Sequence, residues 1–443
     1  MLLLGVCVLS VSWLFVGCVS WKAQAERYLT LEPTRYVIVH PVGREDQPAV
    51  RAFIERKRAR GFDIELVGLD LTLEPAARFA AIAEALAARN EPEQSAYLLI
   101  LASHAELPMG PWPVTGAPEG VLSDLPLLAG VTELGRSVDD GDWRGAFAFP
   151  PPWIAGRVPF EGEHHIAAML ENSVAMEDRE HAPTALLGTE RFAVPFDAAL
   201  VMAGVDAHLE ERGWKATSYA NDAPRDEALD RIELTRTGQN LAGHEVQLPP
   251  LHPTFLVDWA RSAPDLVFLI SHASGMPAKF TSEDGGEMVY FVGAGRGLIN
   301  PETFLLYNDG GLHDALDAPA SPVRPAFLMT TGCSMGDPEN LMLADLVVRG
   351  WVGPIWTSTH TNGPAPPIAA MRAERSAARY VAAGLPIGMA HHATITAYLS
   401  DATRDPFGWL VAPFLWGQRE VNVLSYTIYG DPSVAIVERD GDF

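Results

Sequence analysis

The sequence predicts an α/β fold of two subdomains, each with a mostly parallel sheet flanked by helices. Short β-rich apolar runs alternate with segments of helical periodicity along most of the 443 residues. Several of these runs are apolar without a break, as is typical of parallel strands buried on both faces. In addition, "LLILASHAELPMG" at 98–110 resembles "VFLISHASGMP" at 267–277, as two similar α/β halves would produce.

The first predicted subdomain covers residues 27–185 and opens with a strand–helix–strand–helix–strand alternation. Gly61 is placed to end its first helix, and Pro75 suits the first turn of the second. The Pro- and Gly-rich residues 109–145 are expected to form loops around the short segment "GVLSDLPLLAG". The predicted strands are 35–41, 63–71, 97–108 and 153–160, and the predicted helices are 48–62, 74–90 and 162–175.

The second predicted subdomain covers residues 186–440, with the boundary near 180–190. In "DPENLMLADLVVRG" at 337–350, Asp337 is placed to cap a helix and Gly350 to end it. The predicted strands are 184–192, 214–222, 266–270, 326–331, 354–360 and part of 424–438. The predicted helices are 196–212, 253–262, 337–350, 365–383 and 387–400.

Residues 1–21 form an uncharged apolar run that predicts an export signal. No charged residue precedes Lys22, and the run leads into "LFVGC", which resembles a bacterial lipobox with Cys18 as the lipidated residue. The pattern departs from a lipobox in lacking an early Lys or Arg and in having Phe15 where leucine is usual. We therefore expect an extracytoplasmic protein held to a bacterial membrane by lipid. An uncleaved membrane anchor and an ordinary cleaved signal are the two alternatives.

Charge and cysteine content narrow the function further. The formal net charge of −24 repels phosphate backbones and anionic lipid, which argues against nucleic acid as a partner. The chain has three cysteines, Cys7, Cys18 and Cys333. If Cys7 is removed with the signal and Cys18 carries lipid, Cys333 is the single thiol of an exported protein. Such a thiol is prone to oxidation unless it is buried and inert or has a function.

Two apolar runs end on residues that together can hydrolyse an amide bond. "LVFLISHASG" at 266–275 runs into His272, and "AFLMTTGCSMGD" at 326–337 runs into Cys333. Ligands of parallel sheets bind beyond the carboxyl ends of the strands, so neighbouring strands would bring imidazole and thiol together. The imidazole can then accept the thiol proton, and the helix expected after Asp337 would favour the thiolate. Taken singly, each residue is better explained as a structural histidine or an inert buried cysteine.

Other motifs give weaker signals. His104 also follows an apolar run, but no thiol occupies a matching place in its half. "EHH" at 163–165 and "HH" at 391–392 lack the framework of a metal site, and "GHEVQ" at 243–247 is no metalloprotease motif. "GAGRG" at 293–297 lacks the helix that a dinucleotide loop requires.

Six blocks, in order, resemble the gingipain-type cysteine peptidases, a caspase-like group with a His/Cys catalytic pair. They cover most of residues 97–435, and the last three are the most telling. The blocks are "YLLILASHAELP", "LSDLPL", "IAGRVPF", "LVFLISHASG", "AFLMTTGCSMGD" and "YTIYGDPSV". The resemblance implies a caspase- or gingipain-like pair of α/β subdomains. It also places His104 in a block that is not catalytic.

The resemblance implies a cysteine endopeptidase with His272 as general base and Cys333 as nucleophile. The backbone N–H groups of Ala273 and Cys333 would hold the oxyanion, and the partner would be a polypeptide. Cleavage after Arg or Lys is common in the group. The sequence assigns no single carboxylate to the specificity pocket: Asp124 and Asp337 are guesses, and Asp337 is better explained as a helix cap. No cofactor is implied, and no ligands can be assigned to a structural calcium ion.

One departure from the family pattern motivates an alternative function. The family usually has glycine directly after the histidine, whereas this chain has Ala273, which restricts the backbone angles. The alternative is a catalytically inactive, peptidase-like surface lipoprotein that binds peptide or protein partners.

Overall fold

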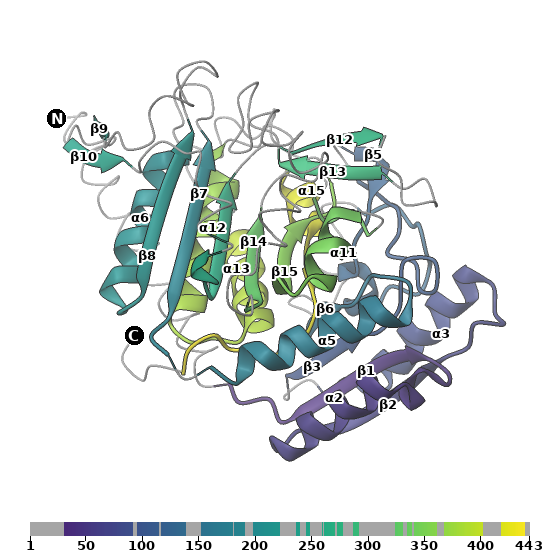
Figure 1. Ribbon diagram of the computed structural model, residues 1–443. Coiled ribbons are helices and arrows are strands. Elements are labelled where there is room, and N and C mark those ends of the chain that lie inside the picture. Colours follow the sequence, from purple (N-terminus) through teal and green to yellow (C-terminus); the bar gives the residue numbers. More distant parts are fainter. Residues whose placement is uncertain are drawn as a thin grey trace.

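Ten strands form one continuous sheet at the centre of the computed structural model (Figure 1). In spatial order they are β2 (Asp63–Leu69), β1 (Arg35–Pro41), β3 (Ala96–Ile100), β6 (Trp153–Arg157), β16 (Tyr426–Tyr429), β15 (Val352–Ser358), β14 (Ala326–Thr330), β11 (Leu266–Ile270), β7 (Thr184–Glu190) and β8 (Lys215–Asn221). The structure describes residues 31–91, 95–114, 117–138, 152–179, 181–190, 198–221, 236–239, 245–248, 259, 261–270, 273–277, 287–291, 324–330, 335–338, 341–360, 367–401 and 418–438.

The sheet consists of two parallel blocks that run in opposite directions. The first block is β2, β1, β3, β6 and β16, and the second is β15, β14, β11, β7 and β8. The blocks meet at an antiparallel seam, where Ser358 of β15 lies opposite Tyr426 of β16. Because the directions are opposite, the carboxyl ends of the two blocks lie at opposite edges of the sheet.

The strands are continuously apolar because helices cover both faces of the sheet. In β1, Tyr36 and Ile38 pack into one hydrophobic core, while Val37 and Val39 pack into a second core on the other face. Fully burying an aliphatic side chain contributes about 1.5–3 kcal/mol, so strands of this kind stabilise the sheet from both sides.

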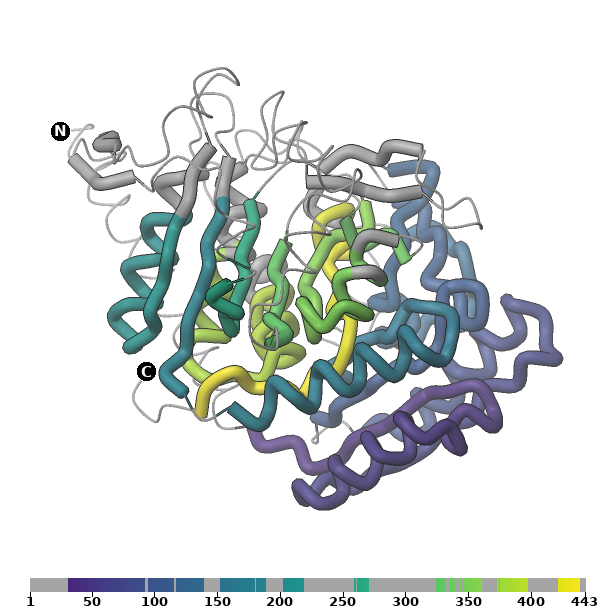
Figure 2. Tube along the Cα trace, in the orientation of Figure 1, coloured from purple at the N-terminus to yellow at the C-terminus, as the bar shows by residue number. Residues whose placement is uncertain are grey.

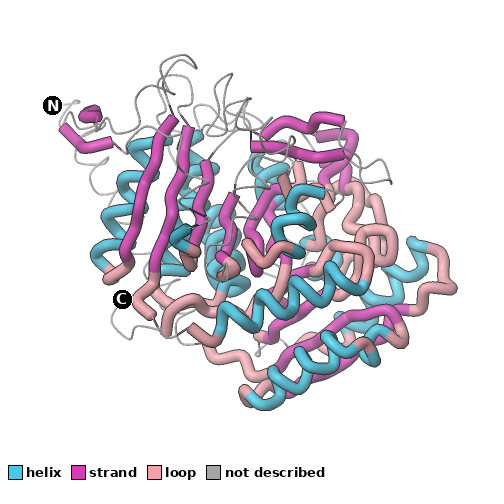
Figure 3. Tube along the Cα trace, viewed as in Figure 1, coloured by secondary structure: helices cyan, strands magenta, loops and turns pink. Residues whose placement is uncertain are grey.

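Figures 1 and 3 show the helices as two layers around the sheet. One face carries α2 (Pro48–Ala59), α5 (Glu163–Glu177) and α11 (Leu341–Val348). The opposite face carries α3 (Pro75–Ala87), α6 (Ala198–Glu211), α12 (Pro367–Ala382) and α13 (Ile387–Asp401). The smaller elements are η1 (Arg44–Asp46), β4 (Trp112–Val114), β5 (Ala117–Val121), α4 (Leu125–Leu128), β9 (Arg236–Gln239), β10 (Glu245–Leu248), β12 (Ala273–Pro277), β13 (Glu287–Phe291) and α15 (Gln418–Ser425).

The predicted α/β alternation is confirmed, with two differences. The sequence suggested a sheet for each subdomain, whereas the structure has one, because β16 pairs with β6 as well as with β15. In Figure 2 the yellow end of the chain can be followed into this position. The boundary between the two predicted subdomains, 27–185 and 186–440, stays a prediction.

The second difference concerns the helix that follows the loop of Cys333. This helix, α11, begins at Leu341, one turn after Asp337, so Asp337 does not occupy the capping position that the sequence suggested. Its end is as predicted: Gly350 has a φ of 74°. The N–H of Gly350 donates to Val347 and that of Trp351 to Leu346, which together terminate the helix.

Candidate active site

The strands that lead to His272 and Cys333 are neighbours. β11 pairs in parallel with β14, with Leu269 opposite Thr330 at their carboxyl ends. Adjacent strands lie about 4.8 Å apart, so the carboxyl ends of β11 and β14 lie side by side at this edge of the sheet. His272 and Cys333 themselves lie outside the described residues, and their contact stays a prediction. The backbone of Ala273 opens β12, which pairs with β13 in a separate antiparallel ribbon.

The segment just after Cys333 is fixed against the seam of the sheet. The N–H of Gly336 donates to the carbonyl of Ser358 at 2.7 Å, at the carboxyl end of β15. The carbonyl of Gly336 accepts a hydrogen bond from the Tyr429 hydroxyl, which comes from β16. Gly336 and its neighbour Met335 are buried. Gly336 is therefore held against the sheet by contacts from two strands.

Tyr429 is fully buried and is suited to donate this bond at all ordinary pH. Burial raises the pKa of its hydroxyl well above the usual value. The guanidinium of Arg157 acts in the opposite direction, and the carboxylates of Asp124 and Asp337 raise the pKa further. Its ring also contacts Phe160 edge-on, with centroids 6.4 Å apart.

Arg157 organises the carboxyl edge of the first block. Its Nη1 donates to the carbonyls of Ala102, Ser103 and Leu107 at 2.6, 3.3 and 3.1 Å. Its Nε and Nη2 lie 2.7 and 2.5 Å from the two carboxylate oxygens of Asp124. Because Arg157 occupies both oxygens, the structure argues against Asp124 as the carboxylate that binds a substrate cation. Asp337, only partly buried, remains a candidate.

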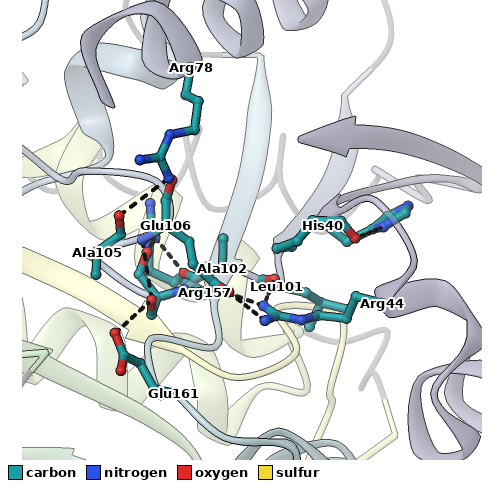
Figure 4. Close-up of polar contacts among 11 residues, drawn as sticks. His40, Arg44, Arg78, Leu101, Ala102, Ala105, Glu106, Arg157 and Glu161 are labelled. Carbon is teal, nitrogen blue, oxygen red and sulfur yellow. Dashed lines mark hydrogen bonds and ion pairs between the residues drawn. The ribbon is translucent and has the colours of Figure 1, made fainter. Parts of the chain in front are cut away.

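Figure 4 shows further contacts at the same edge. Arg44 donates to the carbonyl of Leu101 at 2.7 Å and forms a bidentate pair with Glu106 at 2.9 and 2.5 Å. Burial alone would raise the pKa of Glu106, but the bonds from Arg44 and from the Ser103 N–H lower it. This edge is therefore occupied by an internal network of charges that ties β3 to η1.

His104, the alternative candidate for the catalytic histidine, lies at the edge of the sheet opposite to the candidate active site. His104 follows β3 in the first block, and its Nδ1 accepts the N–H of Met109 at 3.2 Å. Since the two blocks run in opposite directions, this position is at the edge opposite to the ends of β11 and β14. His104 therefore has a structural contact in a turn, in agreement with the sequence interpretation.

The histidine pairs do not gather into a metal site. His164 and His165 stack with ring centroids 3.8 Å apart, and Nδ1 of His165 lies 2.8 Å from the carbonyl of Glu161. His391 accepts the indole N–H of Trp356 at 2.8 Å. Among the described residues, no group of three or more His, Cys, Asp or Glu side chains is placed to bind a metal ion.

Two sequence predictions fall outside what the structure describes. Cys18 and the rest of the predicted signal lie before residue 31, and the glycine-rich 293–297 lies in the undescribed 292–323. None of the helices in the described part of the chain is long and apolar enough to cross a membrane.

Sequence reasoning missed the roles of Tyr429 and Gly336. Both stand in blocks that were recognised, "YTIYGDPSV" and "AFLMTTGCSMGD", but no local pattern links a tyrosine to a carbonyl that is distant in sequence. The contact arises from the placement of β16 next to β15, which is a property of the whole sheet.

No protein-family model matches this sequence, and no curated protein sequence matches it. Solved structures do share its fold. The Arg-specific cysteine proteinase gingipain R is 15% identical with a TM-score of 0.58, over 91% of this chain and 78% of its own. The complex of pro- and mature domains of RgpB from Porphyromonas gingivalis is 14% identical with a TM-score of 0.57, over 90% of this chain and 79% of its own. A further protease structure is 10% identical with a TM-score of 0.55, over 93% of this chain and 80% of its own.

These likenesses establish the fold. The chain has the gingipain-like, caspase-like α/β architecture that the sequence predicted, with a mostly parallel ten-stranded sheet between helices.

Proposed function

We propose that this chain is an extracytoplasmic cysteine endopeptidase. The observation that supports this most strongly is the parallel pairing of β11 with β14, whose carboxyl ends lead into His272 and Cys333. The fold that it shares with gingipain R adds to this support. The substrate would be a polypeptide, and a preference for Arg or Lys before the cleaved bond is part of the proposal.

The proposed reaction proceeds through a thioester. His272 takes the proton of Cys333, and the sulfur attacks the carbonyl carbon of the scissile bond. The N–H groups of Ala273 and Cys333 hold the negative oxygen of the tetrahedral intermediate. The imidazolium then gives its proton to the leaving amine, and the C–N bond breaks. Water, deprotonated by His272, hydrolyses the thioester and releases the thiol and a new carboxylate.

A comparison of the wild type with Cys333→Ala tests this function. Both are purified in the same way and incubated with a library of peptides that differ in the residue before the cleaved bond. We expect cleavage by the wild type only, with Arg or Lys peptides cleaved fastest. Equal cleavage by both proteins would assign the activity to a contaminant, and no cleavage by either would remove the proposal.

The state of the thiol gives an independent measurement. Iodoacetamide labelling of Cys333, followed by mass spectrometry across pH, reports the fraction of thiolate. We expect labelling well below pH 8, and His272→Gln should move it upward. Labelling that begins only near the ordinary thiol pKa of about 8.5 would indicate that no base activates the sulfur.

Ala273 favours a second candidate function, a peptidase-like surface lipoprotein that binds peptides without cleaving them. Ala273→Gly distinguishes the two candidates. If alanine alone blocks the reaction, the variant should cleave peptides that the wild type only binds.

The membrane attachment is proposed as lipid on Cys18. Mass spectrometry of the mature N-terminal peptide should find a diacylglyceryl-type addition on this cysteine, and Cys18→Ala should move the protein from the membrane to the soluble fraction. An unmodified N-terminus after removal of a signal would contradict this attachment.

A further inference from the structure

We propose that Tyr429 is a positioning residue that holds the loop of Cys333 in the geometry needed for attack. The proposal rests on the proposed function, because it assigns Tyr429 a role in that reaction. Two hydrogen bonds support it. The Tyr429 hydroxyl donates to the carbonyl of Gly336, and the N–H of Gly336 donates to the carbonyl of Ser358.

Gly336 is held on both of its backbone polar groups. Its N–H is bonded to the end of β15, and its carbonyl is bonded to a side chain of β16. These strands form the antiparallel seam between the two blocks of the sheet. A segment bonded on both sides cannot slide along the seam without breaking a buried hydrogen bond. The Tyr429 bond therefore helps to fix Gly336, which follows Cys333 by three positions in the sequence.

The space around Gly336 adds a steric restraint. A Cβ on this residue would lie 2.6 Å from Cγ2 of Thr357 and 3.0 Å from the carbonyl oxygen of Ser358. The backbone of Gly336 is thus packed directly against β15, at a separation that a larger residue does not allow. Glycine permits the close approach, and the tyrosine hydroxyl fixes it.

Tyr429 is itself rigidly held, which a positioning residue requires. Its neighbour Gly430 has a φ of 99° and donates its N–H to the carbonyl of Arg157 at 2.7 Å. The next residue, Asp431, accepts the Tyr36 hydroxyl at 2.8 Å and pairs with the buried Lys57. The ring of Tyr429 is therefore fixed from the first block, while its hydroxyl acts on the loop of the second.

The hydroxyl serves this role better than any apolar replacement. Phenylalanine would fill the same space, yet it would leave the buried carbonyl of Gly336 without its partner from Tyr429. A buried carbonyl that loses its hydrogen bond bears a desolvation cost. Movement of Gly336 toward water would relieve this cost, so the substitution favours such a displacement. Displacement of a reacting group by about 1 Å can cost about 100-fold in rate.

The test compares Tyr429→Phe with a matched control, Tyr97→Phe. Tyr97 is also buried, and its hydroxyl contacts the sulfur of Met389 at 3.2 Å. Three quantities are measured: kcat and KM on the best peptide, the pH profile of Cys333 alkylation, and hydrogen exchange of the peptide that spans 331–340. Thermal unfolding of each variant confirms that it is folded.

For Tyr429→Phe we expect kcat to fall by about 10- to 100-fold with KM nearly unchanged. Alkylation of Cys333 should shift to higher pH, and exchange at 331–340 should speed up. Tyr97→Phe should leave all three at wild-type values. A Tyr429→Phe protein with wild-type kcat, alkylation profile and exchange would overturn the positioning role.

The outcomes separate this proposal from the proposed function. If the wild type cleaves no peptide, the peptidase function fails, and the exchange and alkylation measurements still show whether Tyr429 holds the loop. If the wild type cleaves and Tyr429→Phe matches it in all three measurements, the positioning role alone fails.

Discussion

The ammonium of Lys57 lies 2.5 Å from Oδ2 of Asp431, and neither side chain exposes any surface. The same ammonium lies 2.5 Å from Glu177 and 2.8 Å from the Ser433 hydroxyl. These residues come from α2, from the end of α5 and from the turn after β16, so one buried cluster joins three distant parts of the chain. A buried charge is costly unless it is paired, and here the charges are paired with one another.

Lys57→Met should strongly destabilise the protein. Methionine nearly matches the shape of the lysine stem but leaves the carboxylates of Asp431 and Glu177 buried without their ammonium. We expect the free energy of unfolding to fall by about 3–5 kcal/mol, measured by denaturant titration.

The control is Arg51→Met on the same helix. Arg51 forms an exposed pair with Asp46 at 3.7 Å, and such pairs contribute at most about 1 kcal/mol. A similar loss of stability in both variants would mean that the cluster has no special role.

Asp124→Asn should lower stability and leave specificity unchanged. The substitution removes the charge that pairs with the fully buried Arg157, at an expected cost of about 3–5 kcal/mol. Because both oxygens of Asp124 serve Arg157, the ratio of kcat/KM for Arg and Leu peptides should match the wild type. A change in this ratio, measured on matched peptides, would restore Asp124 as a specificity residue.

The stability of the protein should depend on pH through His391. Burial and, to a smaller extent, the neighbouring His392 lower the pKa of His391 from 6.5 to about 3. As the pH falls, His391 of the unfolded chain therefore binds a proton near pH 6.5, whereas His391 of the folded protein binds one only near pH 3. This contribution to stability is complete above pH 6.5 and is lost progressively as the pH falls toward 3.

His391→Gln removes the titration while keeping an oxygen that can accept the Trp356 N–H. The melting temperature of the variant, followed from pH 7 to pH 4, should fall less steeply than that of the wild type. Parallel curves would show that His391 takes up its proton equally in both states.

Gly336→Ala should lower activity by displacing the loop from β15. The added Cβ would contact the side chain of Thr357 and the backbone of Ser358, and we expect kcat to fall by about 100-fold. The second substitution Thr357→Ser removes the Cγ2 atom of the closest contact, so the double variant should recover part of the loss. Steady-state kinetics of the two single variants and the double variant measure this coupling. Strict additivity would argue against the contact.

The sequence predicts the helices and strands of this fold well, because hydrophobic periodicity and the residues that begin or end an element are local signals. The helix of α3 follows from Pro75 and an alanine-rich face, and β1 follows from an unbroken apolar run that can only be buried on both sides. The predicted His/Cys pair required that the strands before His272 and Cys333 be neighbours, and the structure shows that β11 pairs in parallel with β14.

What the sequence could not predict depends on pairing between distant segments. No local signal places β16 between β6 and β15, because the pairing of Tyr429 with Arg157 joins segments that are far apart in the sequence. The contact of Arg157 with Asp124 could not be predicted for the same reason. The helix after Asp337 was placed a turn too early, because its Asp-Pro signal matches a good helix start.

The position of β16 also constrains how this protein can be made. This strand follows the other nine strands of the sheet in the sequence, yet it lies in the middle of the sheet. Until it arrives, β6 and β15 each present an open strand edge, the kind of surface on which chains aggregate. A nascent chain that stalls before Tyr426 therefore lacks the strand that joins the two halves of the sheet, and those two edges need protection until β16 has been synthesised.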